Sequence, residues 1–301
     1  MAASREAKEH MDLAEKALKT SWIGLKFAPD HLSASMEFAN AATKFRSANM
    51  MEYAVAAWVR SAEMKEKLSD LFGAGRAYES AGAICDGTGP GGPKAAAKHW
   101  EKAIRCFRLC AKGDIAAKLI LKRAESLEKD GDVEGAKVAF EEAIEVFKED
   151  EKDYQLGDVY KQYIGFLVRS NRVDDAAKAM DGHVEILVRN KHYPFAHKEL
   201  LAKAVLFLSV QDVVRADQAL QPGIAVEGWF MSKESQVGSE LVEAFQANDA
   251  ENAERLLKEQ VFTFLQVEVA RLAKKLKVPD FGAQAVAGSA GVAATSGARA
   301  A

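Results

Sequence analysis

The chain has 301 residues, of which 49% are hydrophobic and 28% charged, and its formal net charge is −3. This balance argues against a nucleic-acid-binding protein, which usually carries a strong basic excess. The three cysteines form no disulfide framework, so we expect a reducing, cytoplasmic environment. The charged N-terminus has no apolar signal region, and the most apolar stretch, 200–210, is too short to span a bilayer.

Alanines near the start of successive predicted helices recur about every forty residues. They are Ala54, Ala96, Ala136, Ala176 and Ala216. A large side chain follows each alanine by four residues: Trp58, Trp100, Phe140, Met180 and Leu220. An offset of four residues places both side chains on one helical face. We expect the alanine to let a partner helix approach and the large side chain to fill the space between them.

A partner helix is predicted before each turn. The partners cover 35–48, 68–84, 115–129, 156–170 and 196–209. Each unit is therefore a helix, a short turn and a helix, as in tetratricopeptide (TPR) repeats, with helices longer than that repeat of ~34 residues allows. The sequence predicts an all-α, TPR-like solenoid of antiparallel helix pairs in a right-handed superhelix.

The repeat pattern divides the chain into three predicted parts. Residues 1–226 form the helical-repeat solenoid, with an apolar loop at 20–30. Residues 227–278 form a C-terminal bundle with helices over 234–246 and 250–277. Residues 279–301 are a Gly/Ala-rich tail without large aliphatic side chains beyond valine, and we expect this tail to be disordered.

Two motifs weakly suggest chemistry. The segment 87–95 is similar to a phosphate-binding loop, but Pro93 separates Gly92 from Lys94 and Ala95 replaces the hydroxyl that would hold Mg²⁺. Cys106 and Cys110 could hold a metal only with a second ligand segment, and buried thiols are the favoured interpretation. We therefore expect no catalytic residue, no metal and no cofactor, and predict that the protein is not an enzyme.

Several segments resemble gamma-type members of the soluble NSF attachment protein (SNAP) family. The similar segments are 16–20 (KALKT), 22–30 (WIGLKFAPD), 39–45 (ANAATKF), 77–82 (AYESAG) and 167–177 (LVRSNRVDDAA). Their order and spacing extend the resemblance over about residues 11–278. It implies an adaptor in intracellular vesicle trafficking that coats the four-helix SNARE bundle after membrane fusion. It also implies that the adaptor recruits the hexameric ATPase NSF, which hydrolyses ATP and pulls the bundle apart.

The resemblance implies a membrane-contacting loop near the N-terminus. Its apolar residues are Trp22, Ile23, Leu25 and Phe27. We expect peripheral attachment to membranes, strengthened when several copies surround one bundle. The alternative is that these side chains fold back onto the first helices as core.

A basic segment provides the expected SNARE-binding face. Residues 98–123 contain eight basic and two acidic side chains, and acidic SNARE surfaces would attract them. The segment 115–118 (IAAK) matches the lysine-bearing segment of related alpha-type proteins. The expected contacts are Lys98, Lys102, Arg105, Lys118, Lys122, Lys161 and Arg169. The alternative for each is an ordinary solvated helix face.

Acidic residues near the C-terminal end are the expected contacts for NSF. They are Asp249, Glu251 and Glu254. The leucine-bearing acidic terminus of alpha-type proteins is absent, since this chain ends in Ala-rich sequence. These acids could instead stabilise a helix N-terminus. A TPR-like scaffold for a chaperone or signalling partner remains the alternative function, and it would need a carboxylate clamp for peptide tails.

Overall fold

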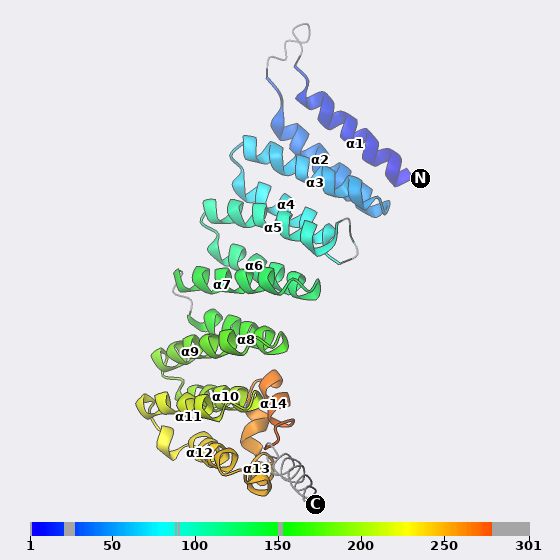
Figure 1. Ribbon diagram of the computed structural model, residues 1–301. Coiled ribbons are helices and arrows are strands. Elements are labelled where there is room, and N and C mark those ends of the chain that lie inside the picture. Colours follow the sequence, from blue (N-terminus) through cyan, green and yellow to red (C-terminus); the bar gives the residue numbers. More distant parts are fainter. Residues whose placement is uncertain (1, 21–27, 88, 90, 150–152, 279–301) are drawn as a thin grey trace, which may run out of the picture. The chain divides into compact units, whose positions relative to one another are not determined.

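The computed structural model describes residues 2–20, 28–87, 89, 91–149 and 153–278. In these residues every regular element is a helix, which confirms the predicted all-α fold (Figure 1). The chain divides into two compact units, one ending at Val159 and the other beginning at Tyr160. The division falls inside α8 (Asp153–Arg169).

The first unit consists of helices of similar length, each packed against the next along the chain. Among the pairs with the most extensive contacts are α1–α2, α2–α3, α3–α4 and α4–α5. The helices are α1 (Ala2–Leu18), α2 (His31–Ser47), α3 (Met51–Lys67), α4 (Leu71–Cys85), α5 (Gly92–Leu109), α6 (Gly113–Lys129) and α7 (Val133–Glu149).

The second unit begins as a helical repeat and continues with shorter elements. Helix α10 packs against α9, α11, α12 and α14. The elements after α8 are α9 (Val173–Arg189), α10 (Tyr193–Ser209), α11 (Val213–Leu220), η1 (Gln221–Ala225), η2 (Trp229–Met231), α12 (Lys233–Gln246), α13 (Ala250–Leu256), η3 (Gln260–Phe264) and α14 (Val267–Ala273). The predicted domain limit at residue 226 stays a prediction.

The same short turn joins most neighbouring helices. After the helix a single residue adopts a left-handed conformation, and the next residue's N–H bonds to the carbonyl five residues back. At Asn49 φ is 58°, and the Met50 N–H lies 2.9 Å from the Phe45 oxygen. The other residues with this conformation and bond are Ser69, Ala111, Gly131, Asn171, Lys191, Gln211 and Asn248. This is the helix-ending arrangement that satisfies free carbonyls at a helix C-terminus.

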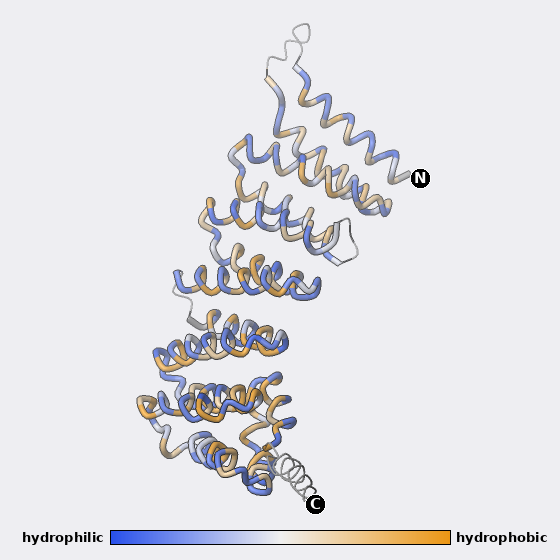
Figure 2. The backbone as a smooth tube through the Cα atoms, in the orientation of Figure 1, coloured by the Kyte–Doolittle hydropathy of each residue, from blue (hydrophilic) through white to orange (hydrophobic). Residues whose placement is uncertain are grey.

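The repeat alanines line the contacts between helices, as the period predicted. Ala54, Ala96, Ala136, Ala176 and Ala216 are all fully buried. Of the large partners, four are buried and Trp58 is partly buried. Trp100 shows how closely the helices approach: its indole N–H donates to the Glu79 carbonyl at 3.2 Å, and a Cβ on Gly82 would lie 2.4 Å from the indole nitrogen. Hydropathy accordingly alternates around the helices (Figure 2).

The prediction of one continuous helix over 250–277 is wrong. The chain leaves helical geometry at Glu259 and again at Leu265 and Gln266, where ψ lies between 141° and 166°. These breaks bring Val261, Phe262 and Leu265 into the core, where each is buried. The free energy gained by burying these apolar side chains outweighs the loss of a continuous helix, because valine, threonine and phenylalanine have only modest helix propensity. The five predicted partner helices correspond to α2, α4, α6, α8 and α10, and each observed start lies two to four residues from the predicted one.

No helix in the described parts of the chain is both long and apolar enough to cross a bilayer.

The left-handed turn residues permit a paired test of the fold. Ala111 is exposed with φ 57°, so Ala111→Gly should stabilise the protein by about 0.5–1 kcal/mol because glycine adopts this conformation without steric cost. Ala56 is exposed inside α3, so Ala56→Gly should destabilise by about 1 kcal/mol. Chemical denaturation of both variants measures the difference, and effects of the same sign would contradict the turn geometry.

Candidate functional site

The four predicted membrane-contacting residues, Trp22, Ile23, Leu25 and Phe27, lie outside the described residues. The segments that flank them are described and are joined to each other. The Asp30 N–H donates to the Ala17 carbonyl at 3.0 Å, and the Asp30 carboxylate caps α2 by accepting the Ser33 N–H at 2.9 Å. The loop therefore leaves α1 and enters α2 at neighbouring points.

The α5 members of the predicted SNARE-binding set line one hollow. Lys98, Lys102 and Arg105 are exposed, and with Arg108 they bound a cavity of about 640 Å³. The hollow also contains Arg123 from α6 and Glu142 from α7. Sequence reasoning counted Arg108 and Arg123 in the basic segment but did not single them out, and it missed Glu142.

Acidic residues from neighbouring repeats partly neutralise this hollow. Glu142 lies 3.3 Å from Arg108 and 2.5 Å from Arg123. Glu66 lies 3.6 Å from Arg105. Both acids are far from α5 in sequence, so the charge count over 98–123 overstated the positive charge that this surface presents.

Lys118 and Lys122 form a separate pair on α6. Both are exposed, but neither lines the hollow between α5 and α7. Arg123 does line it, and the rotation of about 100° per helical residue directs Lys122 to a different face. The Lys122 ammonium lies over the face of the buried Trp100 ring, 5.0 Å from its centre, while the Lys118 side chain is exposed.

Lys161 and Arg169 belong to the second unit and have structural contacts there. The Lys161 carbonyl accepts a hydrogen bond from the Gln266 amide at 2.5 Å. The Arg169 guanidinium lies 2.5 Å from Glu268, whose side chain is 17% exposed. Both side chains remain exposed. Arg169 therefore helps to hold α14 against α8.

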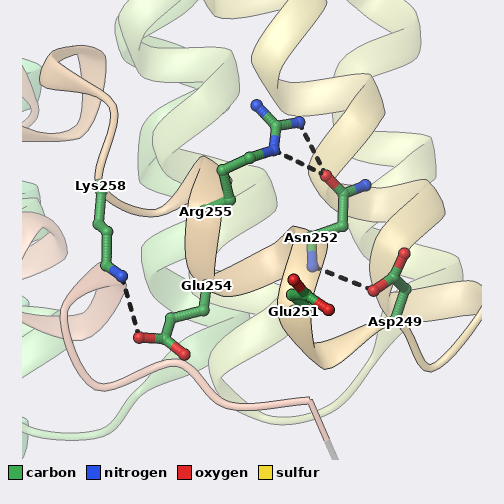
Figure 3. A pocket seen from close by; sticks show the side chains of 6 residues that line it. All are labelled: Asp249, Glu251, Asn252, Glu254, Arg255 and Lys258. Atoms are coloured by element: carbon green, nitrogen blue, oxygen red, sulfur yellow. Dashed lines mark hydrogen bonds and ion pairs between the residues drawn. The ribbon is translucent and has the colours of Figure 1, made fainter.

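The three predicted NSF-binding acids gather at α13 around a hollow of about 570 Å³ (Figure 3). All three are exposed. The Asp249 carboxylate caps α13 by accepting the Asn252 N–H at 3.0 Å, and Glu254 lies 3.1 Å from Lys258. The capping role expected as the alternative for these acids is thus present at Asp249.

Of the three cysteines, Cys106 lies near an acidic side chain, that of Glu66. Cys106 is buried, and its thiol is 3.7 Å from Glu66. Burial, and secondarily Glu66, raises the pKa of Cys106 to about 11. The same two causes raise the pKa of Tyr78, whose hydroxyl donates to Glu66 at 3.2 Å. In the described residues no cluster of three potential metal ligands occurs.

Sequence reasoning also missed an exposed apolar group in the second unit. Ile224, Phe230 and Met231 are 66%, 71% and 92% exposed. Trp229 between them is buried, and the His197 ring lies edge-on at 5.5 Å. The signal was present in the sequence as three large apolar residues, Trp229 to Met231, directly after Gly228.

Antiparallel helix pairs with charged outer faces define a helical-repeat protein of the kind that binds other macromolecules on extended surfaces. The family model described as "Soluble NSF attachment protein, SNAP" matches residues 5–269. The chain therefore belongs to the SNAP family.

Two curated relatives are similar to the chain over most of its length. One is a gamma-soluble NSF attachment protein of Dictyostelium discoideum, 24% identical over 91% of this chain and 83% of the relative. The other is the gamma-soluble NSF attachment protein of Arabidopsis thaliana, 22% identical over 92% of this chain and 94% of the relative. These relatives agree with the gamma-type resemblance seen in the sequence.

Proposed function

We propose that this protein is an adaptor that binds SNARE complexes and recruits and stimulates the NSF ATPase for SNARE disassembly in vesicle trafficking. The match to the SNAP family over residues 5–269 carries the proposal. In this role the chain binds and positions its partners, and NSF hydrolyses the ATP. Assaying NSF-driven SNARE disassembly with and without the purified chain tests the proposal, and no stimulation would contradict it.

SNARE binding is assigned to the exposed basic side chains. Lys118 and Lys122 form an exposed ridge without an acidic partner in the described part of the chain, so their charge is available to an acidic helical bundle. The α5 group of Lys98, Lys102 and Arg105 lies in the hollow and is partly neutralised. Lys161 and Arg169 are further proposed contacts, although Arg169 also binds Glu268. The α6 pair is therefore the principal proposed contact.

Membrane contact is assigned to Trp22, Ile23, Leu25 and Phe27. The hydrogen bond between Asp30 and Ala17 supports this proposal, because it holds the described segments on either side of these residues close together at one end of the α1–α2 pair. Burial of one such side chain contributes up to ~1.5–3 kcal/mol, so partial insertion of several supports weak, reversible attachment. The proposal implies a cytoplasmic adaptor that associates peripherally with membranes.

NSF contact is assigned to Asp249, Glu251 and Glu254. Their grouping around one hollow supports the proposal, because it presents three carboxylates within two turns of chain. Lys258 and Arg255 also line the hollow, so the net charge there is close to neutral and the contact must depend on position as well as charge.

The α6 pair gives a direct test of SNARE binding. Lys118→Glu/Lys122→Glu should weaken SNARE affinity about tenfold or more at low salt, mostly through slower association, and less at high salt. The control Lys8→Glu/Lys67→Glu reverses two exposed lysines elsewhere in the first unit. Melting temperatures should change little, since exposed charges contribute little to stability. Equal SNARE affinity for both double variants would contradict the assignment.

Membrane contact is tested by Trp22→Ser/Phe27→Ser. Binding to liposomes should fall several-fold because two of the largest apolar side chains are lost, whereas helix content by circular dichroism should be unchanged. A useful comparison is Leu68→Ser/Leu109→Ser, which removes two exposed apolar side chains from the first unit outside the loop. Unchanged liposome binding by the loop variant would exclude membrane contact, and loss of helix content would favour a core role.

NSF contact is tested by Asp249→Asn/Glu251→Gln/Glu254→Gln. Asparagine caps helices about as well as aspartate, so α13 should persist while three charges are lost. NSF stimulation should fall several-fold with SNARE binding retained. The matched control is Asp70→Asn/Glu52→Gln/Glu63→Gln, in which Asp70 caps α4 through the Gly73 N–H at 2.9 Å. Retained stimulation by the first variant, or equal loss by both, would contradict the assignment.

A further inference from the structure

The hollow between α5 and α7 differs from the exposed charged surfaces because its cations lie at two depths. Lys98, Lys102 and Arg105 stand exposed on α5 at its edge. Arg123 reaches it from α6 with a side chain that is only 12% exposed, and Arg108 and Glu142 complete the lining. The Arg123 guanidinium thus lies within a recess of about 640 Å³, with the more exposed cations of α5 around it.

Positive charge remains after the internal ion pairs are counted. Five basic side chains line the hollow against two acidic ones, and Glu66 outside the lining pairs with Arg105, so the basic side chains still outnumber the acidic ones by two. Glu142 is shared by Arg108 and Arg123, so one carboxylate serves two guanidinium groups. Lys98 has no acidic partner in the described part of the chain, and Lys102 has only the ring of Tyr78 at 5.2 Å. The hollow therefore attracts an anion that can enter it.

The geometry points to a compact ligand that carries several phosphate groups, and we propose that this hollow binds an inositol polyphosphate, either free or as a lipid headgroup. Arginine forks bind phosphate oxygens in pairs, and lysines add point charge at the edge. The α5 cations extend from residue 98 to residue 108, which corresponds to about 15 Å of helix and exceeds the size of a single phosphate. Arg123, paired with Glu142 and 12% exposed, is less accessible to a wide helical bundle than the exposed cations at the edge, so a compact ligand suits the recess better.

This binding does not depend on the proposed function, because it is measured with neither SNAREs nor NSF present. The full chain is titrated with inositol hexakisphosphate by calorimetry at about 0.1 M salt, where charges more than ~10 Å apart are largely screened. One ligand should bind per chain. Lys98→Gln/Arg105→Gln should weaken binding about tenfold, because it removes a rim cation and a guanidinium fork.

The control variant removes the same charge from the same part of the fold. Lys112→Gln/Lys129→Gln neutralises two exposed lysines near the ends of α6 that do not line the hollow, and binding should change by less than about twofold. Absence of binding, or equal weakening by both double variants, would overturn the proposal, since the second result indicates only diffuse charge attraction.

Binding to vesicles distinguishes a lipid headgroup from a free inositol polyphosphate. Two kinds of phosphatidylcholine vesicle are compared. One contains phosphatidylinositol 4,5-bisphosphate, and the other contains enough phosphatidylserine to carry the same total negative charge. If the chain binds the phosphatidylinositol 4,5-bisphosphate vesicles more tightly, and Lys98→Gln/Arg105→Gln abolishes this preference, the result supports the proposal and identifies the ligand as a lipid headgroup. Binding of inositol hexakisphosphate without this preference supports a free ligand. Binding to both vesicle types with no effect of Lys98→Gln/Arg105→Gln on vesicles or on inositol hexakisphosphate would overturn the proposal.

Discussion

The reversal of the chain by one left-handed residue determines most other features of this structure. The turns at Asn49, Ser69 and Ala111 in the first unit, and at Asn171 and Lys191 in the second, share positive φ and a hydrogen bond to the carbonyl five residues back. Because this bond uses the free carbonyls of the preceding helix, the next helix begins within two residues and runs antiparallel. Neighbouring helices must then pack closely along their whole length.

Close packing explains the residues that recur at the start of the helices. A helix that begins directly after a tight turn meets its predecessor at once, and only a small side chain fits there. Ala136 and Ala176 are fully buried at this place, and Phe140 and Met180 fill the wider space one turn later. The connection between α4 and α5 is longer than these turns, and there the glycines at 87, 91 and 92 have positive φ.

The same architecture decides which charges act together. One repeat separates Arg105 from Glu66 along the chain, and nearly one separates Arg108 from Glu142, yet each pair lies within ion-pair distance. Conversely, Lys122 and Arg123 are adjacent in sequence but lie on different faces of α6. A partner of this protein therefore meets distinct surfaces: the exposed α6 ridge, the charged recess beside α5 and, in the second unit, the acidic group at α13.

The sequence by itself determined the helical class, the forty-residue repeat and the buried alanines, because these depend on local periodicity and turn chemistry. The family resemblance was also readable from short segments such as 77–82. Only the tertiary structure decided that the segment after Ala250 breaks twice, since burial of Val261, Phe262 and Leu265 depends on a core built by distant helices. It alone also divided the basic segment into a ridge and a recess, because helical rotation and acids one repeat away determine which charges share a surface.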